Sequence, residues 1–232
     1  MPSRKESVLV VDDDARMLRM IQMILGAEGY QVFMASNGEA ALKMLVAENP
    51  DLALLDIMMP GIDGYTLCRR IREFSKIPII IVTAKGNVQE IAQGLECGAD
   101  DYVIKPFSSK VLAARVNAVL RRAKTWDKHL EPIFQSGDLV MDFAHHQVTL
   151  AGKQIELTAT EYKLLSYLIH NAGRLATSDQ ILEAVWGEEY IGEHLLLRVN
   201  IARLRHKLGD DSKEPKFIAS RIGIGYMFLK PS

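Results

Sequence analysis

The first half of the chain alternates five short apolar segments with five amphipathic segments. The apolar segments cover residues 8–11, 31–35, 52–55, 79–82 and 102–104. The segments between them repeat apolar residues at the spacing of a helix that packs on one side. Strands alternating with helices predict a parallel sheet covered by helices on both faces. Such a sheet binds ligands beyond the carboxyl ends of its strands, so a functional site is expected there.

Polar residues follow four of these strands. Asp12 and Asp13 follow the first strand, Asp56 the third, Thr83 the fourth and Lys105 the fifth. Three carboxylates at one rim repel each other unless a cation joins them, and oxygen ligands favour Mg²⁺, with Mn²⁺ as a substitute. The pattern predicts that Asp56 attacks phosphorus and becomes an acyl phosphate, whose oxygens Lys105 and Thr83 would bind.

Each of these residues, taken alone, also has a structural explanation. The acids at positions 12–14 suit the N-cap of a following helix. A threonine often ends a strand, and a Lys-Pro pair often marks the boundary of an element. Their joint occurrence at four strand ends favours one shared site.

Four segments of this half resemble the receiver domain of bacterial two-component response regulators. They are residues 8–13, 54–61, 82–84 and 98–107, which read VLVVDD, LLDIMMPG, VTA and GADDYVIKPF. The resemblance implies a flavodoxin-like (βα)5 fold in which a sensor histidine kinase phosphorylates Asp56. It also implies that Asp13, Asp56 and the Met58 carbonyl hold the metal ion, with Asp12 acting through water.

The same resemblance implies a switch and a dimer. Thr83 and Tyr102 would form the switch pair, and the Lys105-Pro106 peptide bond is expected to be cis. The phosphorylated protein would form a homodimer through its fourth helix, fifth strand and fifth helix. The residues expected on this dimer face are Ile91, Asp100, Asp101, Val111, Arg115 and Arg122. Because Ile91 and Val111 replace a basic and an acidic residue of the family, we expect either a hydrophobic contact or a different dimer.

A polar segment with little periodicity, residues 123–133, is predicted to link the receiver, residues 1–122, to a second domain, residues 134–232. The second domain begins with three predicted strands, at 139–142, 147–150 and 154–157. Three helices follow, over 158–169, from 177 or 178 to about 187, and over 193–208, and a hairpin closes the domain at 217–228. This order predicts an α+β winged helix-turn-helix.

The third of these helices carries four positive charges and no acid between Arg198 and Lys207. A rotation of 100° per residue places positions 197, 201, 204 and 208 on a buried stripe, and the other side is predicted to bind DNA. The predicted DNA contacts are Arg198, Val199, Asn200, Arg203, Arg205, His206, Lys207 and, from the hairpin, Arg221. Arg203 would read guanine, Asn200 adenine and Val199 a thymine methyl group, and the other cations would bind phosphates. A solvated basic face on an ordinary helix is the alternative.

This half resembles the winged-helix effector domain of the OmpR/PhoB family. The matching segments are 157–165, 185–187, 203–208 and 223–226, which read LTATEYKLL, VWG, RLRHKL and GIGY. The resemblance implies a recognition helix in the major groove of promoter DNA, a wing in the minor groove and an RNA polymerase contact around residues 187–192. Leu195 and Leu196 replace polar DNA contacts of the family, and Ile222 replaces the wing arginine, with Arg221 one place earlier. Residues 197–199 and 223–225 are similar to the KdpE-like branch.

The net charge, the cysteines and the length of the apolar runs indicate where the protein is located and which partners it can have. A formal net charge of -1 excludes a globally basic nucleic-acid coat. Cys68 and Cys97 lack metal-type spacing and suit a reducing cytoplasm. The apolar run at 8–11 is too short for a signal peptide or a membrane span, so a cytoplasmic protein without a membrane partner is expected.

The combined pattern predicts a transcription factor rather than an enzyme. Phosphate on Asp56 would favour a homodimer, and two linked winged helices would then bind DNA more tightly than one. One alternative is an aspartyl-phosphate enzyme of the haloacid dehalogenase kind, although residues 12–15 lack the rest of that family's motif. Another is a constitutive DNA-binding protein whose receiver no longer signals, and the altered dimer face keeps this open.

Overall fold

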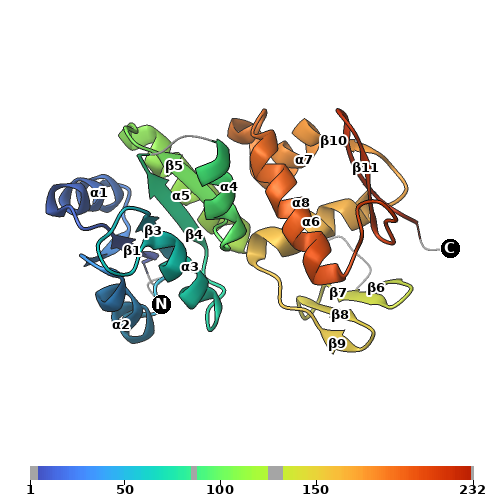
Figure 1. The fold of residues 1–232 in the computed structure, drawn as a ribbon, viewed down its shortest axis with the longest axis horizontal. Helices are drawn as coiled ribbons and strands as arrows, with labels where there is room; N and C mark the ends of the chain where they lie inside the picture. Colours follow the sequence, from blue (N-terminus) through green and yellow to red (C-terminus); the bar gives the residue numbers. More distant parts are fainter. Residues whose placement is uncertain (1–4, 85–87, 125–132, 231–232) are drawn as a thin grey trace. The chain divides into compact units, whose positions relative to one another are not determined.

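The computed structural model describes residues 5–84, 88–124 and 133–230, with the side chains of residues 122–124 left out. The chain divides into two compact units, residues 1–121 and 122–232. Each unit has its own sheets and helices (Figure 1). No helix within the described ranges has the length and apolar character needed to cross a bilayer.

The first unit contains a parallel sheet of five strands in the order β2-β1-β3-β4-β5. The strands are β1 (Ser7–Val11), β2 (Gln31–Ala35), β3 (Leu52–Asp56), β4 (Ile79–Thr83) and β5 (Asp101–Ile104). The order reverses at β1, which pairs with β2 on one side and β3 on the other. A ligand crevice is expected beyond the carboxyl ends at such a reversal, which is where the acidic residues lie.

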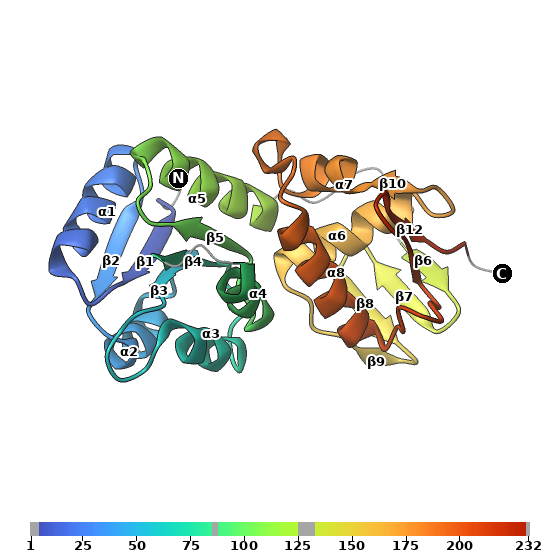
Figure 2. The same ribbon diagram turned by 45° about the horizontal axis from the view of Figure 1, so that its top comes forward.

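Helices cover both faces of this sheet (Figure 2). On one face lie α1 (Ala15–Ala27) and α5 (Ser109–Lys124), and on the other lie α2 (Gly38–Glu48), α3 (Gly64–Arg72) and α4 (Val88–Glu96). Alternate residues of β1 serve the two cores: Leu9 packs in the layer of α2 and α3, and Val10 packs in the layer of α1 and α5. Strands buried on both faces have unbroken apolar sequences, and the predicted flavodoxin-like α/β fold is confirmed.

The second unit combines two antiparallel sheets with three helices. The first sheet contains β6 (Ile133–Ser136), β7 (Leu139–Asp142), β8 (Gln147–Leu150) and β9 (Lys153–Gln154) in that order. The helices are α6 (Ala159–His170), α7 (Ser178–Val185) and α8 (His194–Leu208), with a short 3-10 helix, η1 (Glu188–Tyr190), before α8. The second sheet has the order β10 (Ala176–Thr177), β12 (Gly225–Phe228), β11 (Ile218–Arg221). The predicted winged helix-turn-helix is therefore confirmed.

Several predicted boundaries differ from the structure. The strand expected over 154–157 is wrong, since only Lys153–Gln154 pair as β9, and both β6 and β10 were missed. Two-residue strands such as β9 and β10 are too short to show an alternating pattern. Both ends of the predicted linker lie in regular elements, because α5 continues to Lys124 and β6 begins at Ile133. A capping box formed by Thr158 and Glu161 begins α6.

Candidate functional site

The carboxyl ends of β1 and β3 bring three carboxylates together. Asp56 ends β3 and Asp12 follows β1, both nearly buried, whereas Asp13 is exposed. One carboxylate oxygen from each of the three lies within 4.8 Å of the others. Lys105 Nζ lies 2.7 Å from Asp12 Oδ2 and 3.1 Å from Asp56 Oδ1. The predicted convergence of these four side chains at one rim is confirmed.

Of the other predicted receiver residues, Thr83 ends β4, Tyr102 lies in β5 and Met58 lies in the loop after β3. Asp56, the last residue of β3, pairs with Val82 of β4. Thr83, which is buried at the end of β4, therefore lies one position further along the sheet than Asp56. The Thr83 carbonyl accepts a hydrogen bond from the Lys105 backbone N–H at 2.7 Å, and the peptide bond after Lys105 is cis, as predicted. Tyr102 is buried in β5, while the Met58 side chain is 56% exposed in the loop after β3.

The electrostatics of the rim depend on Lys105. Burial raises the pKa of Asp56, and the charge and hydrogen bond of Lys105 oppose that rise. Burial alone would lower the pKa of Lys105, but its hydrogen bond to Asp12 and the negative charges of Asp56 and Asp12 outweigh burial and raise it. The ammonium group is therefore held in its charged form, facing two carboxylates. Three carboxylates whose oxygens are this close, with one carboxylate open to solvent, suit a hard divalent cation.

Gly64 explains how α3 can begin so close to the acceptor strand. A Cβ atom at this position would lie 2.1 Å from the Asp56 carbonyl oxygen. The Gly64 N–H donates to the Ile57 carbonyl at 3.1 Å, and the Asp63 side chain caps α3 through the Thr66 N–H. The Asp-Gly pair of the loop thus closes the backbone around the end of β3.

The predicted dimer face is corrected in part. Asp100 is 1% exposed and binds Arg72 at 2.9 Å within the same unit, and Asp101 is fully buried with Arg115 at 3.2 Å. Both carboxylates therefore have partners in their own chain and do not present free charge to a second copy. Ile91 is also buried, whereas Val111 is 47% exposed. The Arg122 side chain lies outside the described residues.

Most of the residues predicted to contact DNA from α8 are bound within their own domain or are buried. Glu161 of α6 is fully buried, and its two oxygens bind Arg203 at 2.9 Å and Lys207 at 2.6 Å. Arg205 donates to the Ile218 carbonyl at 2.7 Å and to Ser220 Oγ at 2.8 Å. Three of the four cations are thus bound to their own domain, because α6 and the hairpin both pack on α8.

Two uncharged residues of the predicted set are also buried. Asn200 is fully buried and its amide donates to the Leu196 carbonyl at 2.9 Å, one turn earlier, while Val199 is 8% exposed. Leu196, expected at a DNA contact position, is buried as well. Leu196, Val199 and Asn200 therefore offer little side-chain surface to a base edge.

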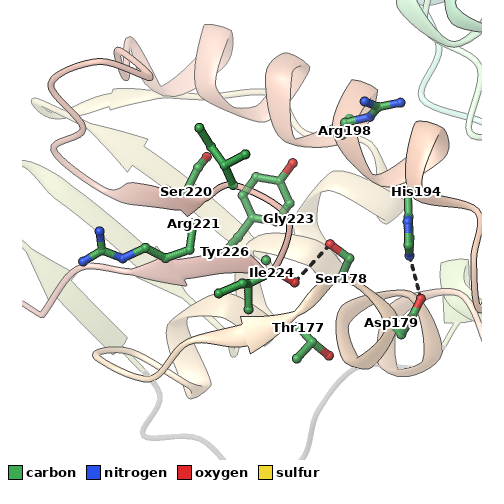
Figure 3. A pocket seen from close by; sticks show the side chains of 12 residues that line it. Thr177, Ser178, Asp179, His194, Arg198, Ser220, Arg221, Gly223, Ile224 and Tyr226 are labelled. Carbon is green, nitrogen blue, oxygen red and sulfur yellow. Dashed lines mark hydrogen bonds and ion pairs between the residues drawn. The ribbon is translucent and has the colours of Figure 1, made fainter.

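The exposed side of α8 carries a different set of residues. Arg198 and His206 of the predicted set are exposed, and His194 and Ala202 complete a stripe at four-residue spacing. A groove separates the start of this stripe from the hairpin, where Arg221 projects and Ile222 is 100% exposed. Figure 3 shows Arg198 and His194 from α8, the first residues of α7, and the hairpin around this groove.

Sequence reasoning missed the pair that fixes the start of α8. Asp179 of α7 lies 2.8 Å from His194 Nε2 and accepts a hydrogen bond from the Gly192 N–H at 3.1 Å (Figure 3). The hydrogen bonds from His194 and Gly192 lower the pKa of Asp179. The two side chains are fifteen positions apart, so no local pattern signals the contact.

Comparisons with known proteins agree with both units. Residues 8–117 match the family model described as the response regulator receiver domain, and residues 152–228 match that described as transcriptional regulatory protein, C terminal. The chain is 43% identical over 237 residues to the probable transcriptional regulator ycf27 of Porphyra purpurea, covering 99% of this chain and 97% of that one. It is 38% identical over 221 residues to the sensory transduction protein RegX3 of Mycobacterium bovis, covering 95% and 97%.

Solved structures give the same order of domains. The Thermotoga maritima response regulator DrrB, described as an OmpR/PhoB homolog, is 34% identical with a TM-score of 0.53, covering 97% of this chain and all of that one. A RitR mutant is 27% identical with a TM-score of 0.77, covering 96% and 98%. The matches run through both units, and the chain belongs to the OmpR/PhoB family of DNA-binding two-component response regulators.

Proposed function

We propose that Asp56 is the phosphoacceptor of this regulator and that a sensor histidine kinase supplies the phosphoryl group from a phosphohistidine. The observation that carries the proposal is the cluster of Asp12, Asp13 and Asp56 with Lys105 between two of the carboxylates. An Asp56 oxygen attacks phosphorus, the imidazole of the kinase leaves, and an acyl phosphate forms on Asp56. Lys105, now bound to Asp12 and Asp56, then binds a phosphoryl oxygen.

The acidic cluster would also hold a divalent cation. Asp13, Asp56 and the Met58 carbonyl would be its direct ligands, with Asp12 acting through water, and the oxygen donors fit Mg²⁺ or Mn²⁺. When bound, such an ion neutralises the negative charge that develops on the phosphoryl oxygens. Asp12 additionally orients the loop, because its Oδ1 accepts a hydrogen bond from the Asp14 N–H at 2.9 Å.

Phosphorylation of Asp56 would change the conformation of the receiver through Thr83 and Tyr102. The Thr83 hydroxyl would move toward the new phosphoryl group, and the Tyr102 ring would follow it inward. Tyr102 lies in β5 beneath the Arg115 guanidinium, which is 5.9 Å from the ring centre and also binds Asp101. A shift of this ring therefore changes the surface of β5 and α5, where we place the homodimer contact that includes Val111.

We place DNA binding on the exposed stripe of α8 and on the hairpin. His194, Arg198, Ala202 and His206 would face the major groove of promoter DNA, and Arg221 would contact a phosphate. Arg203, Arg205 and Lys207 would hold the helix in place instead. The exposed acids Glu188 and Glu189, in the segment around residues 187–192, lie where contact with RNA polymerase is proposed.

Labelling with acetyl phosphate tests the acceptor. The unmodified chain should gain one phosphoryl group by intact mass, and Asp56→Asn should gain none. Asp63→Asn is the matched control, because it removes a nearby acid while asparagine can still cap α3. Labelling of the Asp56→Asn variant would show that another residue is the acceptor. Release of phosphate from a generic ester in large excess over protein would instead indicate a phosphatase.

A further inference from the structure

The only two cysteines of the chain are neighbours in the first unit. Cys68 lies in α3, and Cys97 follows the last residue of α4. The Cys68 thiol donates to the Cys97 carbonyl oxygen at 3.3 Å. Cys97 Sγ in turn donates to the Gly94 carbonyl at 2.9 Å. Two cysteines 29 positions apart thus meet where α3 packs against the end of α4.

The two thiols differ in their access to solvent. Cys68 is fully buried, whereas Cys97 is partly exposed. A small oxidant can therefore meet the Cys97 sulfur first, and the next thiol it would encounter is that of Cys68. We propose that Cys68 and Cys97 form a covalent modification site, at which a hydroperoxide produces an intramolecular disulfide that ties α3 to the end of α4.

The reaction takes place in two balanced steps. The Cys97 thiol loses its proton and the thiolate attacks the distal oxygen of the hydroperoxide; the O–O bond breaks, a sulfenic acid forms, and the leaving oxygen takes up that proton as an alcohol, or as water when the oxidant is hydrogen peroxide. The Cys68 sulfur then attacks the Cys97 sulfur, the S–O bond breaks, and the hydroxyl group leaves as water with the proton from Cys68. Both cysteines are oxidised by one electron each, and the peroxide takes up the two electrons.

The surroundings of Cys68 make it the second thiol to react and a slow one. Its hydrogen bond with Cys97 and its burial raise the pKa of Cys68, and the nearby Arg72 charge opposes this rise only in part. A thiol with a raised pKa has little thiolate, so the disulfide should form over roughly minutes to hours rather than seconds. Arg72 also donates to the Gly98 carbonyl at 3.0 Å, which holds the turn after Cys97 against α3.

Mass spectrometry of the full chain tests the proposal. The protein is treated with hydrogen peroxide, alkylated under denaturing conditions and measured intact without reductant. We expect a species two hydrogens lighter that takes up no alkyl group, regains two alkylation sites after dithiothreitol, and yields a linked Cys68–Cys97 peptide. With no other cysteine in the chain, a monomeric disulfide can only be this pair.

Two variants and a second readout complete the test. Cys97→Ala should leave Cys68 free to be alkylated after unfolding, and Cys97→Ser should do the same while keeping a polar group near the Gly94 carbonyl. Amides of α4 should exchange with deuterium at least about tenfold more slowly after oxidation of the unmodified chain, and should not change in either variant.

Three results would overturn the proposal. They are further oxidation of Cys97 to sulfinic or sulfonic acid while Cys68 stays free, covalent dimers through Cys97, and a disulfide that leaves exchange in α4 unchanged. None of these measurements involves phosphate or DNA, so their outcome is separate from that of the acceptor test.

Discussion

The molecule contains two clusters of basic and acidic side chains that differ in what they can do. One, around Lys105, lies at the candidate site of the receiver, and the other, around Glu161, lies inside the second unit. At the rim of the receiver, Lys105 binds Asp12 and Asp56 while a third carboxylate, Asp13, remains exposed. In the second unit, Arg203 and Lys207 bind Glu161, which is fully buried and also accepts a hydrogen bond from the Thr158 N–H at 2.9 Å. The first cluster has carboxylates to spare for a ligand, whereas the second has its one carboxylate shared by three donors. Charge pairs alone thus do not identify a site; access and spare ligand groups do.

The largest effect should follow removal of the buried carboxylate. Glu161→Ala removes the buried carboxylate that both cations bind and destroys the capping box of α6, so the free energy of unfolding of the second unit should fall by about 3–5 kcal/mol. Urea denaturation followed by tryptophan fluorescence measures it, because Trp186 is buried in this unit. Glu183→Ala, at an exposed site of α7, is the control and should change stability by under about 0.5 kcal/mol. A loss below about 1 kcal/mol for Glu161→Ala would place this acid among the weak surface pairs.

A smaller effect is expected from the backbone that surrounds Asp56. Gly64→Ala would place a methyl group against the Asp56 carbonyl, and the required shift of α3 should destabilise the receiver by about 1–3 kcal/mol. Phosphoryl transfer to Asp56 should slow as well, because the acceptor strand end moves. Gly26→Ala is the matched control, since its added Cβ would have no neighbour within 4 Å and alanine favours the helix by roughly 0.5–1 kcal/mol. Equal stability of the two variants would show that α3 is free to move.

Arg198 and Arg203 separate the two roles of a cation on α8. Arg198→Ala should weaken DNA binding about tenfold, or about 1.4 kcal/mol, and leave stability unchanged because Arg198 is exposed. Arg203→Ala should mainly lower stability, because it removes one of the two cations that bind Glu161. Fluorescence anisotropy with a duplex enriched from a random pool by the unmodified protein gives the affinity. The reverse result, in which Arg203→Ala folds normally but binds DNA poorly, would show that Arg203 contacts DNA, as the sequence predicted.

The contrast between the clusters also explains what the sequence could predict. Carboxyl ends of parallel strands must meet at one edge, so the positions of Asp12, Asp56 and Lys105 followed from topology. The exposed face of α8 did not, because helical periodicity gives the spacing of buried residues but not the number of elements that cover the helix. Glu161 of α6 and the Ser220 region of the hairpin cover two further sides.

Ion pairs between residues far apart in the sequence could not be predicted either, because they also depend on how the elements pack. Asp100 and Arg72 are 28 positions apart, and their pairing depends on how the last residue of α3 meets the residue before β5. The sequence showed two adjacent acids on the expected dimer face, at 100 and 101, and nothing local indicated that both would be neutralised inside the unit. A capping box, in contrast, has a local sequence pattern, because both of its partners lie within one turn of helix.

The smallest expected effect concerns the tip of the hairpin. Ile222 is 100% exposed and therefore adds nothing to packing, so Ile222→Ala should leave stability unchanged. If the hairpin lies near the phosphate backbone, as proposed, Ile222→Arg should tighten DNA binding by about 1 kcal/mol or less and steepen the dependence of log affinity on log salt by about one. Anisotropy titrations at several salt concentrations measure both quantities. Weaker binding by Ile222→Ala, with an unchanged salt slope, would point instead to an apolar contact between this isoleucine and the DNA. The tip would then resemble neither cluster, because its contribution would come from shape and desolvation rather than from charge.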